Sequence, residues 1–207
     1  MGPCLCRDDK KVGMNKNVRG FATLELAVVT GFFVVVVAVV VFYLNPIERA
    51  KQGHDQRLTN DAQKILSALS SFYTIKGRMP WAAAIDTDTL SPALAWKPLR
   101  ASEIGICQDE SCRDSGELIT SGFLNQGFKS LDSVVGRNGV IYVGKVSGPK
   151  GTVWACFLPV SEKLRKATGN LYRIALDQPV PVSGTLNTCP SNLTWGEEDV
   201  CYACIAK

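Results

Sequence analysis

A single carboxylate, Glu25, stands at the start of the longest apolar stretch in the chain. The 19 residues 26–44 that follow it carry no charge, and a helix of about 20 such residues can cross the roughly 30 Å hydrocarbon core of a membrane. An ionised carboxylate at membrane depth is costly, so it normally has a function and a cationic partner. The simplest partner is a free amino terminus at the same depth, which cleavage between Gly20 and Phe21 would create.

The position of the charges favours a membrane anchor with one orientation. An ordinary secretory signal is cut after its apolar block, at small residues, but residues 41–46 read Val-Phe-Tyr-Leu-Asn-Pro and offer no such site. The basic segment 10–19 should stay in the cytoplasm by the positive-inside rule. The sequence therefore predicts a single-pass protein of the cytoplasmic membrane whose carboxy-terminal part lies outside the cytoplasm.

The distribution of charge does not support nucleic-acid binding. The chain has 207 residues, enough for one domain and an appendage, and a formal net charge of +4. Five basic and two acidic residues fall within positions 1–20, so the remainder carries a net charge of only +1. Nucleic-acid binding depends on clustered Lys and Arg, and we predict no nucleic-acid partner.

The string Arg19-Gly20-Phe21-Ala22-Thr23-Leu24-Glu25, with the apolar run after it, resembles the prepilins of type IV pili and the pseudopilins of type II secretion systems. The resemblance extends to about residue 80. It implies that a prepilin peptidase cuts after Gly20 and methylates the new amino group of Phe21. It also implies that Glu25 neutralises the amino terminus of a neighbouring subunit during assembly.

The same resemblance implies the partners and the size of the leader. The partners are identical or related pilin subunits, an inner-membrane assembly platform and, before assembly, membrane lipid. Residues 14–20 form a seven-residue leader of typical family size, so we expect translation to start at Met14. If it starts at Met1, Cys4 and Cys6 are cytoplasmic cysteines or a metal or lipid site.

The apolar helix should continue as an amphipathic one. Apolar residues recur at steps of three and four from Ile47 to Phe72, which predicts one buried stripe. Pro46 should kink or open the helix, and Gly77 and Pro80 should end it. The polar face, which includes Asp55, is expected to be solvated, with a weak pair between Arg57 and Asp61. His54 is the only histidine, which excludes a site with two histidine ligands.

The rest of the chain predicts a small antiparallel sheet. Residues 81–136 are rich in turn formers and read as an elaborated connection with a short helix at 121–130. Four strand-like runs follow, at 140–143, 152–158, 171–176 and 200–205. We therefore expect an α+β fold, in which a long amino-terminal transmembrane and amphipathic helix packs on a small antiparallel-sheet head, as the resemblance to pilins also implies.

Six cysteines fall in the second half of the chain: Cys107, Cys112, Cys156, Cys189, Cys201 and Cys204. In an oxidising compartment they predict disulfides. We expect a local bond between Cys107 and Cys112, with the other four tying the carboxy-terminal region to the sheet.

Three other chemistries for the head stay open. Cys107, Cys112, Cys201 and Cys204 have spacings that could ligate zinc, and the last two form a Cys-x-x-Cys pair that could be redox-active. Acidic residues at Asp109 and Glu110, or at 197–199, could bind calcium. Surface acidity and structural disulfides are the simpler interpretations, so we predict no metal and no cofactor.

These observations predict a non-enzymatic structural subunit of a type IV pilus or type II secretion-like filament. The expected parts are a cleaved leader (1–20), a transmembrane and assembly helix (21–45), an amphipathic stalk helix (46–80) and a disulfide-stabilised extracytoplasmic head (81–207). The subunit would reach the cell surface in the filament. The alternative is a signal-anchored surface protein with a zinc or thiol-disulfide head.

Overall fold

The computed structural model describes residues 19–83, 93–136, 140–148, 151–167, 171–175, 178–181, 194–196 and 200–207. Side chains are not described at 19–23, 43–44, 175, 178 and 180–181. The chain divides into two compact units, Met1–Pro46 and Ile47–Lys207. The stalk helix therefore belongs to the same unit as the head.

Two consecutive helices account for the amino-terminal part of the described chain. Helix α1 spans Arg19–Leu44 and helix α2 spans Pro46–Lys76. We expected one continuous helix with a kink or opening at Pro46. The structure instead has a break between two helices one residue earlier, at Asn45, whose φ is 36°. Asn tolerates positive φ, and Pro46 then occupies the first turn of α2, where its missing N–H costs nothing. Gly77 ends α2 as predicted, with φ 65° and a hydrogen bond from its N–H to Tyr73 O at 2.8 Å.

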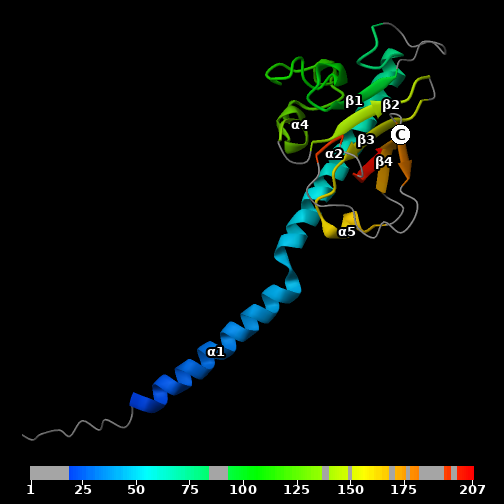
Figure 1. Cartoon of the computed structure of the whole chain (residues 1–207). Coiled ribbons are helices and arrows are strands. Elements are labelled where there is room, and N and C mark those ends of the chain that lie inside the picture. Colours follow the sequence, from blue (N-terminus) through cyan, green and yellow to red (C-terminus); the bar gives the residue numbers. More distant parts are fainter. Residues whose placement is uncertain are drawn as a thin grey trace, which may run out of the picture. The chain divides into compact units, whose positions relative to one another are not determined.

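The head is built on a six-stranded sheet of order β1-β2-β3-β6-β4-β5, in which all neighbouring pairs are antiparallel. The strands are β1 (Leu94–Pro98), β2 (Tyr142–Lys145), β3 (Val153–Phe157), β4 (Leu171–Ala175), β5 (Gln178–Pro181) and β6 (Tyr202–Ala206). The four predicted strands correspond to β2, β3, β4 and β6, so the expectation of four strands was two too few. Figure 1 shows α2 running along one face of this sheet.

Short helices fill the connections. They are η1 (Ser102–Ile104), α3 (Glu117–Thr120), η2 (Gln126–Ser130), α4 (Asp132–Val135) and α5 (Glu162–Arg165). The single helix predicted at 121–130 is wrong, because only η2 forms there, as a 3₁₀ helix. Gly122 has φ 79° and Asn125 is extended, so the backbone cannot stay helical between α3 and η2.

The core lies between α2 and the sheet. Leu58, Ile65, Leu69 and Phe72 of α2 are at most 2% exposed and belong to one cluster with Val143 of β2 and Phe157 of β3. Successive residues of a strand point to opposite faces. Accordingly, Trp154, Cys156, Tyr202 and Cys204 of β3 and β6 pack on the outer face of the sheet, in a second cluster with Trp96 and Trp195.

Candidate functional site

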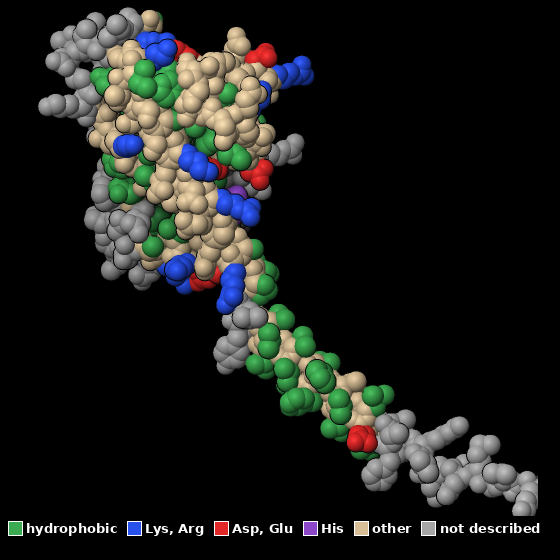
Figure 2. Space-filling view, turned by 180° about the vertical axis from the view of Figure 1, so that it is seen from behind, with side chains coloured by type: hydrophobic (Ala, Val, Ile, Leu, Met, Phe, Trp, Pro, Cys, Tyr) green, Lys and Arg blue, Asp and Glu red, His purple; other side chains and the backbone are tan. Residues whose placement is uncertain are grey.

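Helix α1 is apolar, and its described side chains are exposed. By length and composition it is the one helix in the described chain that could cross a membrane. Leu24, Leu26, Phe32 and Val34 are 65–68% exposed. The hydroxyl of Thr30 donates to the carbonyl oxygens of Leu26 (2.8 Å) and Ala27 (3.1 Å), so this polar group needs no partner outside the helix. Figure 2 shows the described part of α1 covered by hydrophobic side chains.

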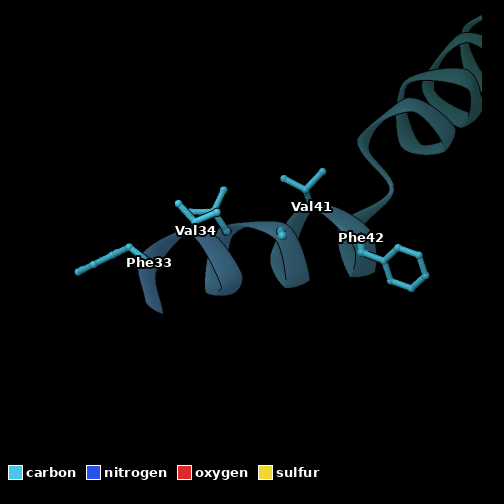
Figure 3. A pocket seen from close by; sticks show the side chains of 6 residues that line it. Phe33, Val34, Val41 and Phe42 are labelled. Carbon is cyan, nitrogen blue, oxygen red and sulfur yellow. The ribbon is translucent and has the colours of Figure 1, made fainter. Parts of the chain in front are cut away.

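An open apolar groove runs along one side of α1. It is lined by Phe33, Val34, Val37, Ala38, Val41 and Phe42. Figure 3 shows Phe33 and Phe42 projecting at its two ends, with Val34 and Val41 between them. Ala38 is the smallest residue of this set, so another helix could approach closely at this level.

The residues predicted for processing and assembly lie in the first part of α1. Gly20 and Phe21 follow its first residue, Arg19, and their side chains are not among those described. Glu25 is exposed, between Leu24 and Leu26, which are exposed as well. Spacing of four residues on a helix brings positions 21 and 25 to the same side, one turn apart.

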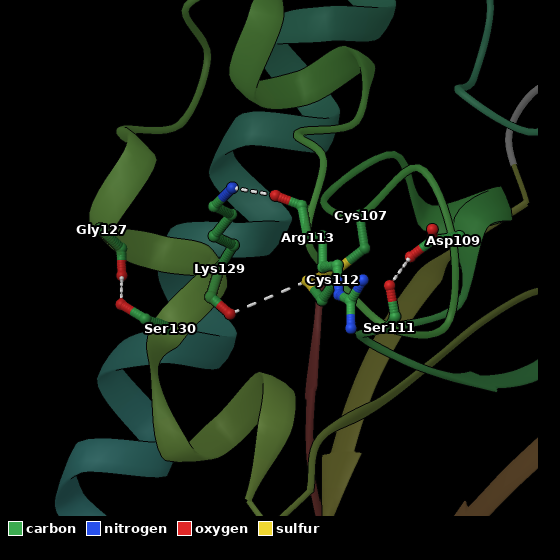
Figure 4. The surroundings of a disulfide bond; sticks show 8 residues. All are labelled: Cys107, Asp109, Ser111, Cys112, Arg113, Gly127, Lys129 and Ser130. Atoms are coloured by element: carbon green, nitrogen blue, oxygen red, sulfur yellow. Dashed lines mark hydrogen bonds between the residues drawn. A yellow bond between two sulfur atoms is a disulfide. The ribbon is translucent and has the colours of Figure 1, made fainter.

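The local cysteine loop of the head is closed by a disulfide. Cys107 and Cys112 are bonded, with their Cα atoms 4.7 Å apart, as the sequence analysis expected for this pair. Figure 4 shows how the following segment is held: Lys129 Nζ donates to Arg113 O (2.6 Å), and the disulfide-bonded Sγ of Cys112 lies 3.8 Å from Lys129 O. The loop is thereby tied to η2.

A second disulfide crosses the outer face of the sheet. Cys156 of β3 and Cys204 of β6 are directly paired in the strand register, with Cα atoms 4.1 Å apart, and are bonded. Cys201 is also disulfide-bonded, and Cys189 lies outside the described residues. Cys204 is therefore bonded to Cys156 and not to Cys201, and Cys107, Cys112 and Cys204 do not present free thiolates to zinc.

The acidic tip of the cysteine loop forms local contacts. Ser111 Oγ donates to Asp109 Oδ1 at 2.6 Å, and this bond, together with the backbone N–H groups of Cys112 and Ser111 and the charge of Arg113, lowers the pKa of Asp109. Within the described ranges, no group of three or more His, Cys, Asp or Glu side chains could hold a metal ion. The acidic residues 197–199 lie outside those ranges.

Asp55 is a polar residue of α2 whose environment differs from the prediction. We expected a solvated carboxylate, but its side chain is 3% exposed. Its Oδ1 accepts from Val160 N (3.0 Å) and its Oδ2 from Ser161 N (2.8 Å), while Ser161 Oγ caps α5 by accepting from Leu164 N (3.3 Å). Asp55 thus holds the loop before α5 against α2. Its spacing of three and seven residues from Leu58 and Ala62 was the available signal.

The predicted pair between Arg57 and Asp61 is also wrong. Asp61 accepts from Ser133 Oγ at 2.9 Å and has Lys64 at 3.8 Å. His54 is half-buried, and its Nε2 has no hydrogen-bond partner within the described part of the chain. Its position on the stripe side of α2 agrees with the sequence.

Replacing Asp55 should destabilise the head strongly for a single polar residue. Asp55→Asn keeps the shape of the side chain, but its NH₂ group cannot accept a hydrogen bond from one of the two backbone N–H donors. The loss of a hydrogen bond to a charged group costs about 1.5–3 kcal/mol. We expect urea unfolding of the full chain in detergent, followed by tryptophan fluorescence, to show this loss. Asp114→Asn, a charge change at an exposed position, is the matched control and should leave the midpoint unchanged. Equal midpoints for both variants would contradict the role given to Asp55.

Comparison with protein-family models, curated proteins and solved structures finds no match for this chain. The long apolar helix followed by a helix-backed antiparallel sheet is compatible with a pilin fold.

Proposed function

We propose that the chain is a structural, non-enzymatic subunit of a type IV pilus or type II secretion-like filament. The observation that carries this proposal is α1: an apolar helix that begins with Arg19-Gly20-Phe21, with an acid near its start and exposed side chains along its described length. A helix of this kind needs lipid or other helices around it.

In this proposal the helix serves two environments in turn. It first anchors the subunit in the cytoplasmic membrane, with the head outside the cytoplasm. A prepilin peptidase then cuts after Gly20, and the assembly platform transfers α1 from lipid into a bundle of identical or related helices. The groove around Ala38 supports close packing of helices, and Glu25 supplies the charge that pairs with the amino terminus of a neighbouring Phe21.

The disulfides support a head that works outside the cytoplasm. Bonds such as Cys156–Cys204 persist in oxidising compartments. They also compensate for the limited core of a small domain. A surface filament would expose the head to solvent throughout its life.

The proposal is tested by processing. The full chain is co-expressed with a prepilin peptidase, extracted from membranes and analysed by intact mass and amino-terminal sequencing. We expect a mature chain that starts at Phe21 and carries one added methyl group. Carbonate extraction of the same membranes reports insertion separately.

Replacing the glycine before the cut makes this test specific. Gly20→Val should block cleavage, because the peptidase must accommodate the residue before the cut. The matched control is Gly53→Val in α2, where an added Cβ meets nothing within 4 Å, and this variant should be cleaved like the wild type. A wild-type chain that keeps its leader beside an active peptidase would instead support the signal-anchored surface protein.

A further inference from the structure

Basic side chains gather at one end of the second unit, around the first turns of α2. They come from the first turns of α2 and from α5 with the residue after it: Arg49, Lys51, Lys163, Arg165 and Lys166. We call this set the basic collar. The backbone N–H of Lys163 donates to Glu48 Oε1 at 3.2 Å, which fixes α5 beside the first turn of α2. Figure 2 shows Lys and Arg side chains around this end of the unit.

Among the residues that the structure describes, the collar carries more positive charge than the nearby carboxylates neutralise. Three such carboxylates lie close by. Glu162 pairs with Lys166, which lowers its pKa, with smaller contributions from Arg165 and Lys51. Glu48 accepts the bond from α5, and Asp55 is buried on two backbone donors. Among the described residues, the side chains of Arg49, Lys51 and Lys163 make no hydrogen bond or ion pair, and Arg49 and Lys163 are exposed.

Two residues of the collar, Arg49 and Lys51, follow α1 closely in the sequence. Arg49 comes five residues after Leu44, the last residue of α1, and at about 1.5 Å per residue Lys51 lies within roughly 8 Å of Pro46 along α2. The polar headgroup layer on each side of a bilayer is about 5–8 Å thick. If α1 crosses a membrane, as the proposed function requires, Arg49 and Lys51 follow the span closely enough to reach the headgroups. Within the second unit, the bond to Glu48 holds α5 beside these residues.

We propose that the basic collar binds the phosphate groups of anionic phospholipids in the leaflet that faces the head. Lys and Arg side chains are suited to phosphate, and a cluster of them beside a membrane span is attracted to an anionic surface. A second copy of the chain is a poorer partner, because several head carboxylates already have donors: Glu103 pairs with Lys97, Glu117 with Arg78, and Asp109 with Ser111. Lipid contact would hold the subunit against the membrane until assembly withdraws it.

The test compares lipid selectivity in the inserted full chain. The protein is reconstituted into vesicles of phosphatidylcholine with 30% phosphatidylglycerol, a composition chosen by us, and spin-labelled forms of the two lipids are compared by the fraction of immobilised label. A triple variant, R49Q/K51Q/K163Q, removes the unpaired cations. The control, K76Q/R100Q/R113Q, removes the same charge from exposed positions elsewhere in the unit.

We expect the wild type and the control to prefer phosphatidylglycerol by roughly fivefold or more, which is the effect of about one basic residue near an anionic surface. The triple variant should lose most of that preference, and raising the salt should weaken it in the wild type. An unchanged preference in the triple variant, or none in the wild type, overturns the collar as a lipid site while leaving processing and insertion intact. A chain that carbonate extracts from the vesicles overturns this inference and the proposed function together.

Discussion

Glu25→Gln should abolish filament formation while the leader is still removed. In the proposed assembly, Glu25 pairs with the amino terminus of a neighbouring Phe21 inside a water-poor helix bundle. Removing one partner of a buried ion pair leaves an uncompensated charge, at a cost of about 3–5 kcal/mol. Since 1.4 kcal/mol is tenfold in an equilibrium constant, each subunit addition should weaken by roughly a hundredfold or more.

The measurement is the amount of the protein in sheared filaments, by immunoblot and electron microscopy, in cells with a working assembly system. Glu25→Asp is the matched control because it keeps the charge on a shorter side chain, and it should retain part of the assembly. Amino-terminal sequencing of each variant separates assembly from processing. Wild-type filament levels in Glu25→Gln would sink the pairing mechanism and leave the cleavage after Gly20 untouched.

The sequence predicted those elements whose hydrophobic pattern was regular. The apolar run and the three-and-four spacing of Leu58, Ile65 and Phe72 identified α1 and α2, and short β-branched and aromatic runs identified the inner strands β2, β3, β4 and β6. Such patterns report which face of an element is buried, and burial is what the fold preserves. For the same reason, the end of α2 at Gly77 could be read from one residue.

The two strands that the sequence missed are the two edges of the sheet. Strand β1 ends in Pro98, and β5 contains Pro179 and Pro181. Proline lacks the N–H that a central strand must donate, so it argues against a strand in the sequence and yet is tolerated at an edge, where one side of the backbone is unpaired. Only the order of strands in the sheet tells whether a proline-containing segment is an edge strand or no strand. That order depends on contacts between distant segments.

The candidate site was predictable only in part, for a similar reason. Phe21 and Glu25 are neighbours in the sequence, so their placement on one helix followed from the apolar run alone. Asp55 reaches Val160 and Ser161 across more than 100 positions, and the partner of Cys156 depends on the register between β3 and β6. No local pattern contains that information, whereas the short loop between Cys107 and Cys112 could be expected from proximity.

Removing the disulfide between Cys156 and Cys204 should destabilise the head more than removing the one between Cys107 and Cys112. The first bond closes a loop of 48 residues and the second a loop of 5. In the chain-entropy account, the longer loop contributes about 4 kcal/mol and the shorter about 2 kcal/mol, because a longer cross-link removes more freedom from the unfolded chain. Cys156 and Cys107 are both fully buried, so the paired double variants C156A/C204A and C107A/C112A are matched for burial of the first cysteine.

Thermal unfolding of the full chain in detergent, under oxidising conditions, checks this order. Tryptophan fluorescence is a suitable probe because Trp154, Trp96 and Trp195 pack in the cluster that contains Cys156. For a domain of this size, 1 kcal/mol corresponds to about 2–4 °C, so C156A/C204A should melt about 8–16 °C below the wild type. Equal losses in the two variants, or a larger loss in C107A/C112A, would show that packing around the bonds outweighs loop closure. If the order holds, the cross-strand bond fixes β6 in the middle of the sheet. The carboxy-terminal strand then stabilises the whole head.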